Sequence, residues 1–148
     1  MAAVGPVFRS LESRVEEVDE AEAWVRQFAG GQGFDESDQY FIGLAVREVL
    51  VNAIKHGNRL DLAKKVGLAL GGAPGELVVE VSDEGEGFLL EEVPDAKAAE
   101  NLERRSGRGL LLARRIMDEI SVHRLQPAGT RVRLAKRVAS PGAERDQM

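Results

Sequence analysis

The sequence contains no cysteine, which excludes disulfide bonds and thiolate metal sites. Aromatic residues make up only 5% of the chain, so its core must rest on Val, Leu, Ile and Ala. No run of 18 or more apolar residues is present, so no membrane span is expected. The first ten residues lack a basic segment followed by a long apolar one, so no secretory signal is expected either. These absences favour a cytoplasmic protein.

The charge and the length of the chain further limit the kinds of protein that it can be. A net charge of −5 argues against direct binding to nucleic acid, because phosphate contacts need clustered Lys and Arg. The length of 148 residues suits one soluble domain. We expect this domain over residues 1–138 and a disordered tail over 139–148. One basic cluster does occur, formed by Arg104, Arg105, Arg108, Arg114 and Arg115.

Apolar residues at helical spacing predict helices over residues 17–29, 36–57 and 108–119. Asp35 and Ser37 offer N-caps for the second helix, and Gly57 with Asn58 supplies its stop. The residues of the third helix expected to face the core are Leu111, Leu112, Ile116 and Met117.

Alternating apolar residues predict half-buried strands over 64–70 and 76–82, joined as a hairpin through the sequence GGAPG. A second hairpin is expected from 120–125 and 130–136, and a short edge strand from 7–14. Residues 84–107 show no sustained period, so we expect a long loop with a short helix near 94–104. The order of elements predicts an α+β fold with helices on one face of a mostly antiparallel sheet.

Glu48 and Asn52 lie four residues apart and therefore one above the other on the same face of the second helix. His56 continues that line. A carboxylate can activate a hydroxyl or a water, and an amide oxygen is a hard ligand that suits Mg²⁺. Taken alone, the pair is also what a solvated polar stripe on a surface helix looks like.

The segment Asp83–Glu84–Gly85–Glu86–Gly87–Phe88 directly follows a predicted strand. A carboxylate at a strand end can accept a hydrogen bond from an exocyclic amine, and nearby glycines let the backbone approach a flat ligand. By itself the segment is equally a strand that ends in a turn, since Asp and Gly are common turn residues.

The segment Ser106–Gly107–Arg108–Gly109–Leu110 leads into the third helix. Glycines before a helix N-terminus expose backbone N–H groups that bind phosphate. The Walker A pattern GxxxxGK[ST] is absent, and no strand runs straight into the segment as a Rossmann fingerprint requires. A flexible lead-in to a helix cap would have the same composition.

Taken together in this order, and followed by Gly129–Thr130, the three segments resemble the motifs of the GHKL superfamily of gyrase, heat-shock chaperone, histidine kinase and mismatch-repair ATPases. The resemblance covers roughly residues 8–138 and implies the Bergerat-type α+β fold. Two stretches, AVREVLVNAIKHGN and LERRSGRGLLLARRIMDEI, are similar to the anti-sigma-factor kinases within it. A histidine kinase would need a dimerisation helix with an acceptor His, whereas the two histidines here are His56 and His123.

The resemblance implies roles for the polar residues of the second helix. Glu48 would be the general base that takes the proton from an acceptor hydroxyl. Asn52 would coordinate Mg²⁺ that bridges the phosphates of ATP. Lys55 and His56 would approach phosphate or substrate.

It also implies roles for the later motifs. Asp83 would bind the adenine amino group, Gly85 and Gly87 would let the backbone approach the nucleotide, and Thr130 would lie near the adenine. Part of a lid over the triphosphate would come from Arg105, Gly107 and Gly109. The chain departs from the commonest pattern at two positions, with Glu86 between the glycines and Arg108 in the lid.

The function implied is that of an anti-sigma factor that is also an ATP-dependent protein serine kinase. Its partners would be a sigma factor and a STAS-type antagonist that accepts the phosphoryl group, and it would form a homodimer. Three alternatives stay open from the residues: a nucleotide-binding module that sequesters a partner without phosphotransfer, a kinase of another STAS regulator, and a structural α+β domain with coincidental motifs.

Overall fold

The computed structural model describes residues 4–85 and 110–139. The lid residues Arg105, Gly107 and Gly109, together with Gly87, the helix expected near 94–104 and the tail beyond Ala139, lie outside these ranges. In chain order the elements are β1 (Val4–Glu12), η1 (Val15–Glu17), α1 (Val18–Gly31), α2 (Glu36–Asn52), η2 (Ala53–Gly57), β2 (Lys65–Gly72), β3 (Glu76–Ser82), α4 (Leu111–Ile116), β4 (Glu119–Arg124) and β5 (Thr130–Arg137).

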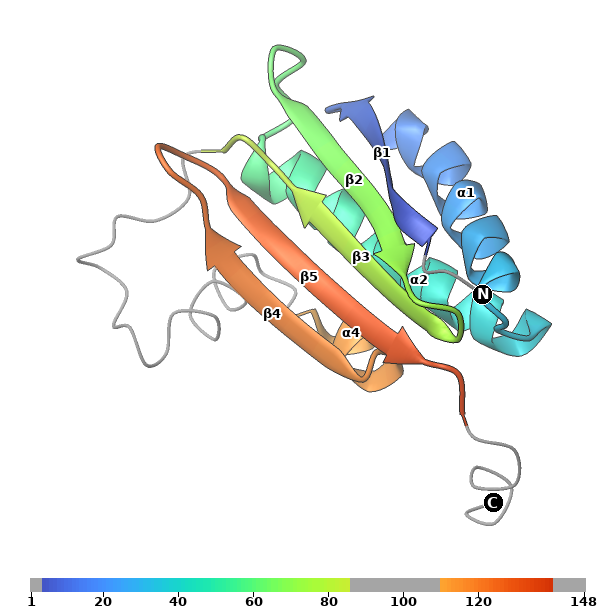
Figure 1. The fold of residues 1–148 in the computed structure, drawn as a ribbon. Helices are drawn as coiled ribbons and strands as arrows, with labels where there is room; N and C mark the ends of the chain where they lie inside the picture. The colour runs from blue at the N-terminus through green and yellow to red at the C-terminus, as the bar shows by residue number, and fades with distance from the viewer. Residues whose placement is uncertain (1–3, 86–109, 140–148) are drawn as a thin grey trace.

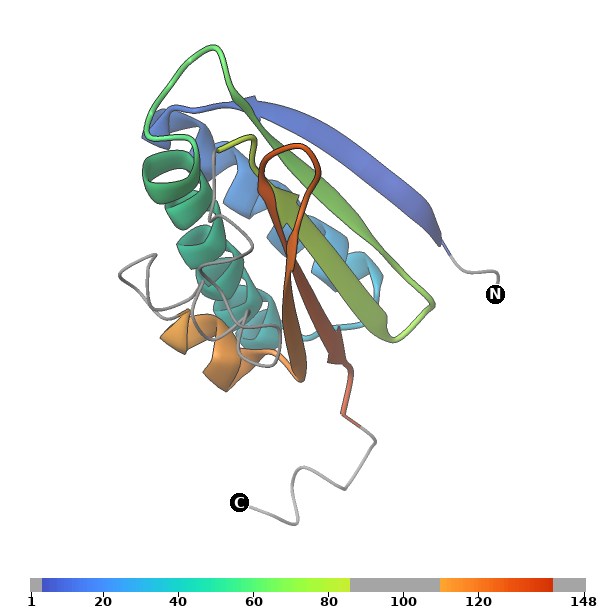
Figure 2. The same ribbon diagram turned by 90° about the vertical axis from the view of Figure 1, so that its left-hand side faces the viewer.

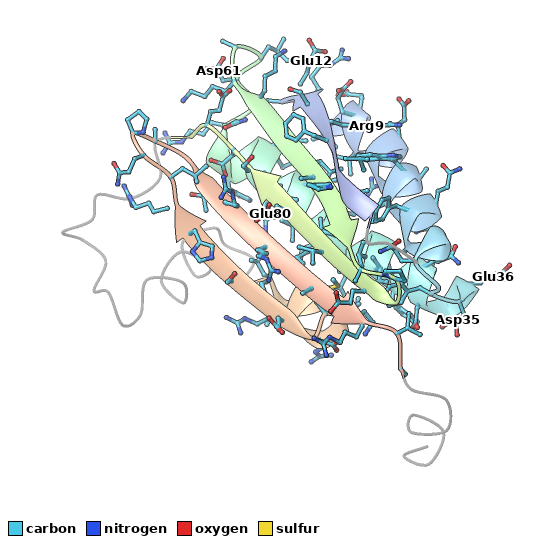
Figure 3. The ribbon with its side chains drawn as sticks, viewed as in Figure 1. Arg9, Glu12, Asp35, Glu36, Asp61 and Glu80 are labelled. Carbon is cyan, nitrogen blue, oxygen red and sulfur yellow. The ribbon has the colours of Figure 1, made fainter. Side chains whose placement is uncertain are left out.

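The five strands form one sheet in the order β1-β2-β3-β5-β4, and every neighbouring pair is antiparallel. The helices α1, α2 and α4 cover one face of this sheet (Figure 1, Figure 2). Figure 3 views the opposite face, where Glu80 of β3 projects from the sheet. This arrangement confirms the predicted α+β class, both hairpins and the edge position of the first strand. No helix in the described ranges is long and apolar enough to cross a membrane.

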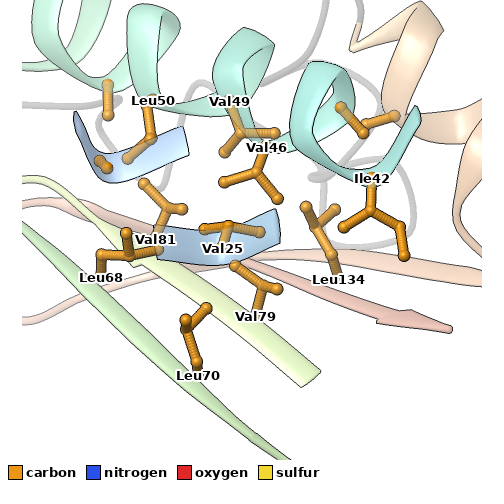
Figure 4. Packing of buried hydrophobic residues seen from close by; sticks show 14 of the residues in the cluster. Val25, Ile42, Val46, Val49, Leu50, Leu68, Leu70, Val79, Val81 and Leu134 are labelled. Carbon is orange, nitrogen blue, oxygen red and sulfur yellow. The ribbon is translucent and has the colours of Figure 1, made fainter. Parts of the chain in front are cut away.

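The core lies between the sheet and the helices. Strand β3 alternates as predicted, with Leu77, Val79 and Val81 fully buried on the helical side. Ile42 and Leu50 of α2 pack down onto these strands (Figure 4). Full burial of each such side chain contributes about 1.5–3 kcal/mol relative to exposure. The core therefore fixes which face of α2 is turned away from the sheet.

The helical segment that contains α2 begins and ends where the sequence predicts, but its last turn is not α-helical. The side chain of Asp35 caps it by accepting a hydrogen bond from the Asp38 N–H at 2.8 Å. The α-helix stops at Asn52, and the π-helical turn η2 takes the chain on to Gly57. The N–H of Asn58 donates to the carbonyl of Ala53, 2.8 Å away and five residues earlier. The predicted helix over 36–57 and its stop at Gly57 and Asn58 are thus confirmed, while the π geometry of the last turn was not foreseen, because a period of apolar residues does not distinguish α from π geometry.

Helix α4 ends at Ile116, earlier than the predicted 119, and residues 108 and 109 lie outside the described ranges. Ile116 packs against the core as predicted, but Leu111 and Leu112 are exposed, at 66% and 36%, so the expectation that they face the core was wrong. Leu110, at the N-cap, adopts a left-handed conformation with φ of 49°, and Leu110 and Ala113 are buried instead. Met117 is buried as predicted, but it lies beyond the helix in extended conformation.

Candidate nucleotide-binding site

The residues singled out by sequence come from three elements on the helical side of the sheet. Glu48 and Asn52 lie on α2, Asp83 follows β3, and Thr130 begins β5. Glu48 and Asn52 share one face of the helix, as their spacing predicts. Together they line an open depression of about 260 Å³, whose other walls are Leu44, Arg47, Val51 and Leu112.

Glu48 joins α2 to α4. One carboxylate oxygen, Oε1, accepts a hydrogen bond from the backbone N–H of Ala113 at 3.0 Å. The residue is half-buried and lines the depression, so its carboxylate is held in place without being enclosed. Such a carboxylate can accept a proton from a hydroxyl placed within hydrogen-bond distance.

Asn52 holds an amide that the described residues leave unsatisfied. The residue is 8% exposed, and its Nδ2 atom is buried with no hydrogen-bond partner there. Leaving a buried polar group unpaired costs about 1–3 kcal/mol. A half-turn of the amide exchanges its oxygen and nitrogen, so the same group can present either a donor or a hard oxygen ligand. The unpaired amide favours a polar ligand at this position.

Asp83 is a buried carboxylate, at 9% exposure. Its Oδ1 accepts the N–H of Gly85 at 3.0 Å, and its own N–H donates to the Thr130 carbonyl at 2.9 Å. Burial raises the pKa of Asp83 above its ordinary value, and the N–H groups of Gly85 and Thr130 counteract part of that rise. A carboxylate kept out of water in this way is suited to accept a hydrogen bond from a ligand.

Three glycines surround Asp83 closely. A Cβ atom on Gly57 would clash with Asp83 Oδ2, and one on Gly85 would clash with the Gly57 carbonyl oxygen. Gly129 has φ of +109°, and a Cβ there would clash with the Asp83 carbonyl oxygen. Gly85 was predicted for close backbone approach to a ligand. Gly57 was read from sequence as a helix stop, and its contact with Asp83 was missed.

Asn58 is a further residue that sequence reasoning treated only as part of a helix stop. It is 1% exposed, and its Nδ2 donates to Ser13 Oγ at 2.9 Å and to the Lys65 carbonyl at 3.0 Å. Its Oδ1 accepts the N–H of Glu84 at 2.8 Å. Asn58 therefore fixes the segment after β3 against the end of η2. Its partners are distant in sequence, so no local pattern indicates this role.

The other predicted residues, Lys55, His56 and Thr130, do not line the depression that holds Glu48 and Asn52. Lys55 and His56 lie on η2 with exposed side chains. Thr130 is paired with Arg124 in the β4–β5 ladder, and its carbonyl holds the Asp83 backbone. The structure thus brings Asp83, Gly85 and Thr130 together at one end of the sheet, with Glu48 and Asn52 on the adjoining helix.

The donor set fits an adenine nucleotide with Mg²⁺. A buried acceptor, Asp83, stands among glycines that keep the space near it free of Cβ atoms. The unpaired Asn52 amide suits phosphate or a hard cation, and a carboxylate lies one turn away at Glu48.

Comparisons with known proteins agree with this geometry. A family model described as a histidine kinase-like ATPase domain matches residues 11–136. The anti-sigma F factor of Clostridium botulinum (strain Eklund 17B / Type B) is 33% identical over 100 residues, which cover 63% of this chain and 66% of that protein.

A crystal structure of the RsbU and RsbW domains of Rv1364c from Mycobacterium tuberculosis is similar with a TM-score of 0.66. The identity is 21%, and the match covers 93% of this chain and 34% of that one, which shows a shared fold. Since the family model spans nearly the whole sheet and its helices, the chain belongs to the histidine kinase-like ATPase domain family, within the GHKL superfamily that its motifs resemble.

Proposed function

We propose that this chain is an anti-sigma factor that also transfers the γ-phosphoryl group of ATP to a serine of a STAS-type antagonist. The observation that carries the proposal is that Glu48 and the Asn52 amide, unpaired among the described residues, line one depression, while the buried carboxylate of Asp83 lies against Gly57 at the end of the same helical segment. The similarity to an anti-sigma F factor supports the regulatory part of the proposal.

The adenine would be recognised at Asp83, whose carboxylate accepts a hydrogen bond from the exocyclic amine. Thr130 would lie near the adenine, and Gly85 and Gly87 would let the backbone lie close to the ring. Burial would make this interaction selective, because a base without a donor at that position would not offer the buried carboxylate of Asp83 this hydrogen bond.

The phosphates would lie toward α2. Asn52 would hold Mg²⁺, which neutralises charge on the phosphates as the phosphoryl group moves. Lys55 and His56 would approach the phosphates from η2, and the lid residues would be Arg105, Gly107 and Gly109. Glu48 would accept the serine proton while its contact with Ala113 holds the carboxylate in place.

The partners follow from the same proposal. Binding of the chain would hold a sigma factor inactive, and phosphorylation of the antagonist would decide which partner is bound. A homodimer is the proposed assembly.

Replacement of Glu48 by Gln tests the proposal. The variant should bind ATP as the wild type does, whereas transfer of labelled phosphate to a purified STAS-domain protein should fall by about 10²–10⁴-fold, the usual contribution of a general base. Calorimetry with a non-hydrolysable ATP analogue and Mg²⁺ gives the affinity. Transfer at a near wild-type rate would exclude Glu48 as the base, and absence of transfer by the wild type itself would leave a nucleotide-binding module.

A further inference from the structure

Helix α2 carries large apolar side chains that are exposed among the residues that the structure describes. Tyr40 and Phe41 are 49% and 46% exposed, and their rings meet edge to face with centroids 5.3 Å apart. Leu44 is half-buried one turn later, and Leu112 of α4, at 36% exposure, lies beside α2. We name this surface, formed by Tyr40, Phe41, Leu44 and Leu112, the α2 patch. Large exposed apolar side chains gathered in this way mark interaction surfaces.

The α2 patch runs directly into the candidate site. Leu44 and Leu112 line the same depression as Glu48 and Asn52. Phe41, Leu44 and Glu48 follow one another at intervals of three and four residues, which places them along one stripe of the helix. A protein that presents a hydroxyl to Glu48 would therefore come next to Leu44 and Leu112, the part of the α2 patch that lines the same depression.

A charged network behind the patch holds its shape. Arg26 of α1 lies over the Tyr40 ring at 5.0 Å and pairs with Glu22. Arg47 of α2 bonds Asp19 at 2.7 Å and the buried Glu22 at 2.9 Å. These hydrogen bonds raise the pKa of Arg47, the one to Asp19 most of all. Glu22 thus pairs with Arg26 on its own helix and with Arg47 on α2. Because these pairs hold α1 against α2, the side chains of the patch need little rearrangement to bind a partner.

The charge beside the patch indicates what the partner carries. Residues 15–25 contain no Lys or Arg. The acidic side chains that they do contain are Glu16, Glu17, Asp19, Glu20 and Glu22. Asp19 and Glu20 are exposed on α1, and Asp19 reaches α2 through its ion pair with Arg47. Opposite charge on a partner would be attracted to this border.

We propose that the α2 patch is the docking surface for the phosphoryl acceptor protein. The acceptor would place an apolar side chain, next to its serine, against Phe41 and Leu44, with a basic group toward the acidic border of α1. This inference rests on the proposed kinase function, because it assigns the patch to the substrate of that reaction.

The test compares Phe41→Ser with Phe8→Ser, which removes an even more exposed Phe, at 66%, from strand β1 instead. Both variants are measured for ATP-analogue affinity, for calorimetric affinity to a purified STAS-domain protein, and for phosphotransfer. Phe41→Ser should weaken acceptor binding about tenfold or more and raise the KM for the acceptor. Its ATP affinity and thermal stability should stay unchanged, and Phe8→Ser should behave as the wild type does.

Equal acceptor binding by Phe41→Ser and wild type overturns the proposal, and if the wild type still transfers phosphate, the kinase function stands without it. If the wild type neither binds nor phosphorylates the acceptor, both proposals fail together. A change in oligomeric state of Phe41→Ser with acceptor affinity intact would show a contact between copies of the chain instead, which also overturns it. Replacement of Glu20 by Lys should weaken acceptor binding severalfold, and tighter binding would contradict the charge assigned to the partner.

Discussion

Asp83 combines two demands that oppose each other. Its burial makes the negative charge expensive, whereas a ligand amine is best held by that same charge. The N–H groups of Gly85 and Thr130 reduce the conflict without removing it, since the pKa remains raised. Ionised Asp83 therefore lowers the free energy of unfolding. This loss of stability is absent below the pKa of Asp83 in the unfolded chain, develops as the pH rises above it, and is complete once the pH has passed the pKa in the folded protein.

The raised pKa predicts a pH dependence of nucleotide binding. As pH falls, Asp83 should become protonated at a higher pH than an ordinary Asp does, and ATP affinity should weaken with it. Asp83→Asn should bind ATP more weakly at neutral pH and lack this transition. Affinity is measured across pH as the ratio of wild type to variant, because the ratio cancels titration of the nucleotide itself.

Glu80→Gln serves as the control, since it removes one carboxylate from the opposite face of the sheet (Figure 3). That variant should keep the wild-type pH profile. The assignment of the adenine contact to Asp83 would be wrong if Asp83→Asn bound ATP as tightly as the wild type at neutral pH.

At the scale of the elements, alternation and helical spacing were sufficient for most of the fold. Strands β2 and β3 were predicted within about two residues of their ends, because one buried face imposes a period of two. The exposure of Leu111 and Leu112 on α4 was not predictable, because apolar spacing alone does not fix which side of so short a helix is buried.

For the candidate site, the motifs predicted which residues lie on a shared face, but not which residues support them. Glu48 and Asn52 were placed correctly by helical geometry alone. The contact of Gly57 with Asp83 and the bonds of Asn58 join segments that are far apart in sequence. Such partners cannot be predicted from the sequence, because they meet only where the fold brings η2, β2 and the end of β3 together.

The connection after β3 depends on Asn58, so we predict that Asn58→Ala weakens both stability and function. Loss of its hydrogen bonds leaves the Glu84 N–H and the Lys65 carbonyl without this partner, which should lower the free energy of unfolding by about 1–3 kcal/mol. ATP affinity should fall as well, because Asp83 adjoins the released segment. Urea unfolding and calorimetry measure the two effects.

Ser13→Ala is the matched comparison, because it removes the bond from Asn58 and the bond to the Lys64 carbonyl but leaves the bond between Asn58 and Glu84 intact. It should destabilise the protein without a comparable loss of ATP affinity. Equal effects of the two variants on affinity would mean that Asn58 has no special role in holding Asp83.

At the scale of the whole molecule, helices cover one face of a single sheet (Figure 2), and the candidate residues come from both layers. A nucleotide bound as proposed would contact both α2 and the ends of β3 and β5. A ligand of this kind stabilises the native state by an amount set by its concentration relative to Kd.

We therefore predict that ATP with Mg²⁺ raises the free energy of unfolding, by about 2.7 kcal/mol at a free concentration of 100 times Kd. Omission of Mg²⁺ should reduce the rise in Tm, because Asn52 then has no cation to hold. Thermal unfolding at several ligand concentrations checks both statements. A Tm that does not respond to ATP under either condition would exclude the nucleotide site.

The antiparallel pairing of β3 with β5 joins residues as distant as Glu76 and Arg137, whereas Glu48 and Asn52 are brought together within one helix. Local contacts form early in folding and long-range strand pairs form late. The half of the site that faces the phosphates should thus exist before the half that faces the base. During refolding, a fluorescent ATP analogue should therefore bind only after the slowest change in the tryptophan emission of Trp24. The time at which the analogue binds would then mark the time at which the sheet is complete.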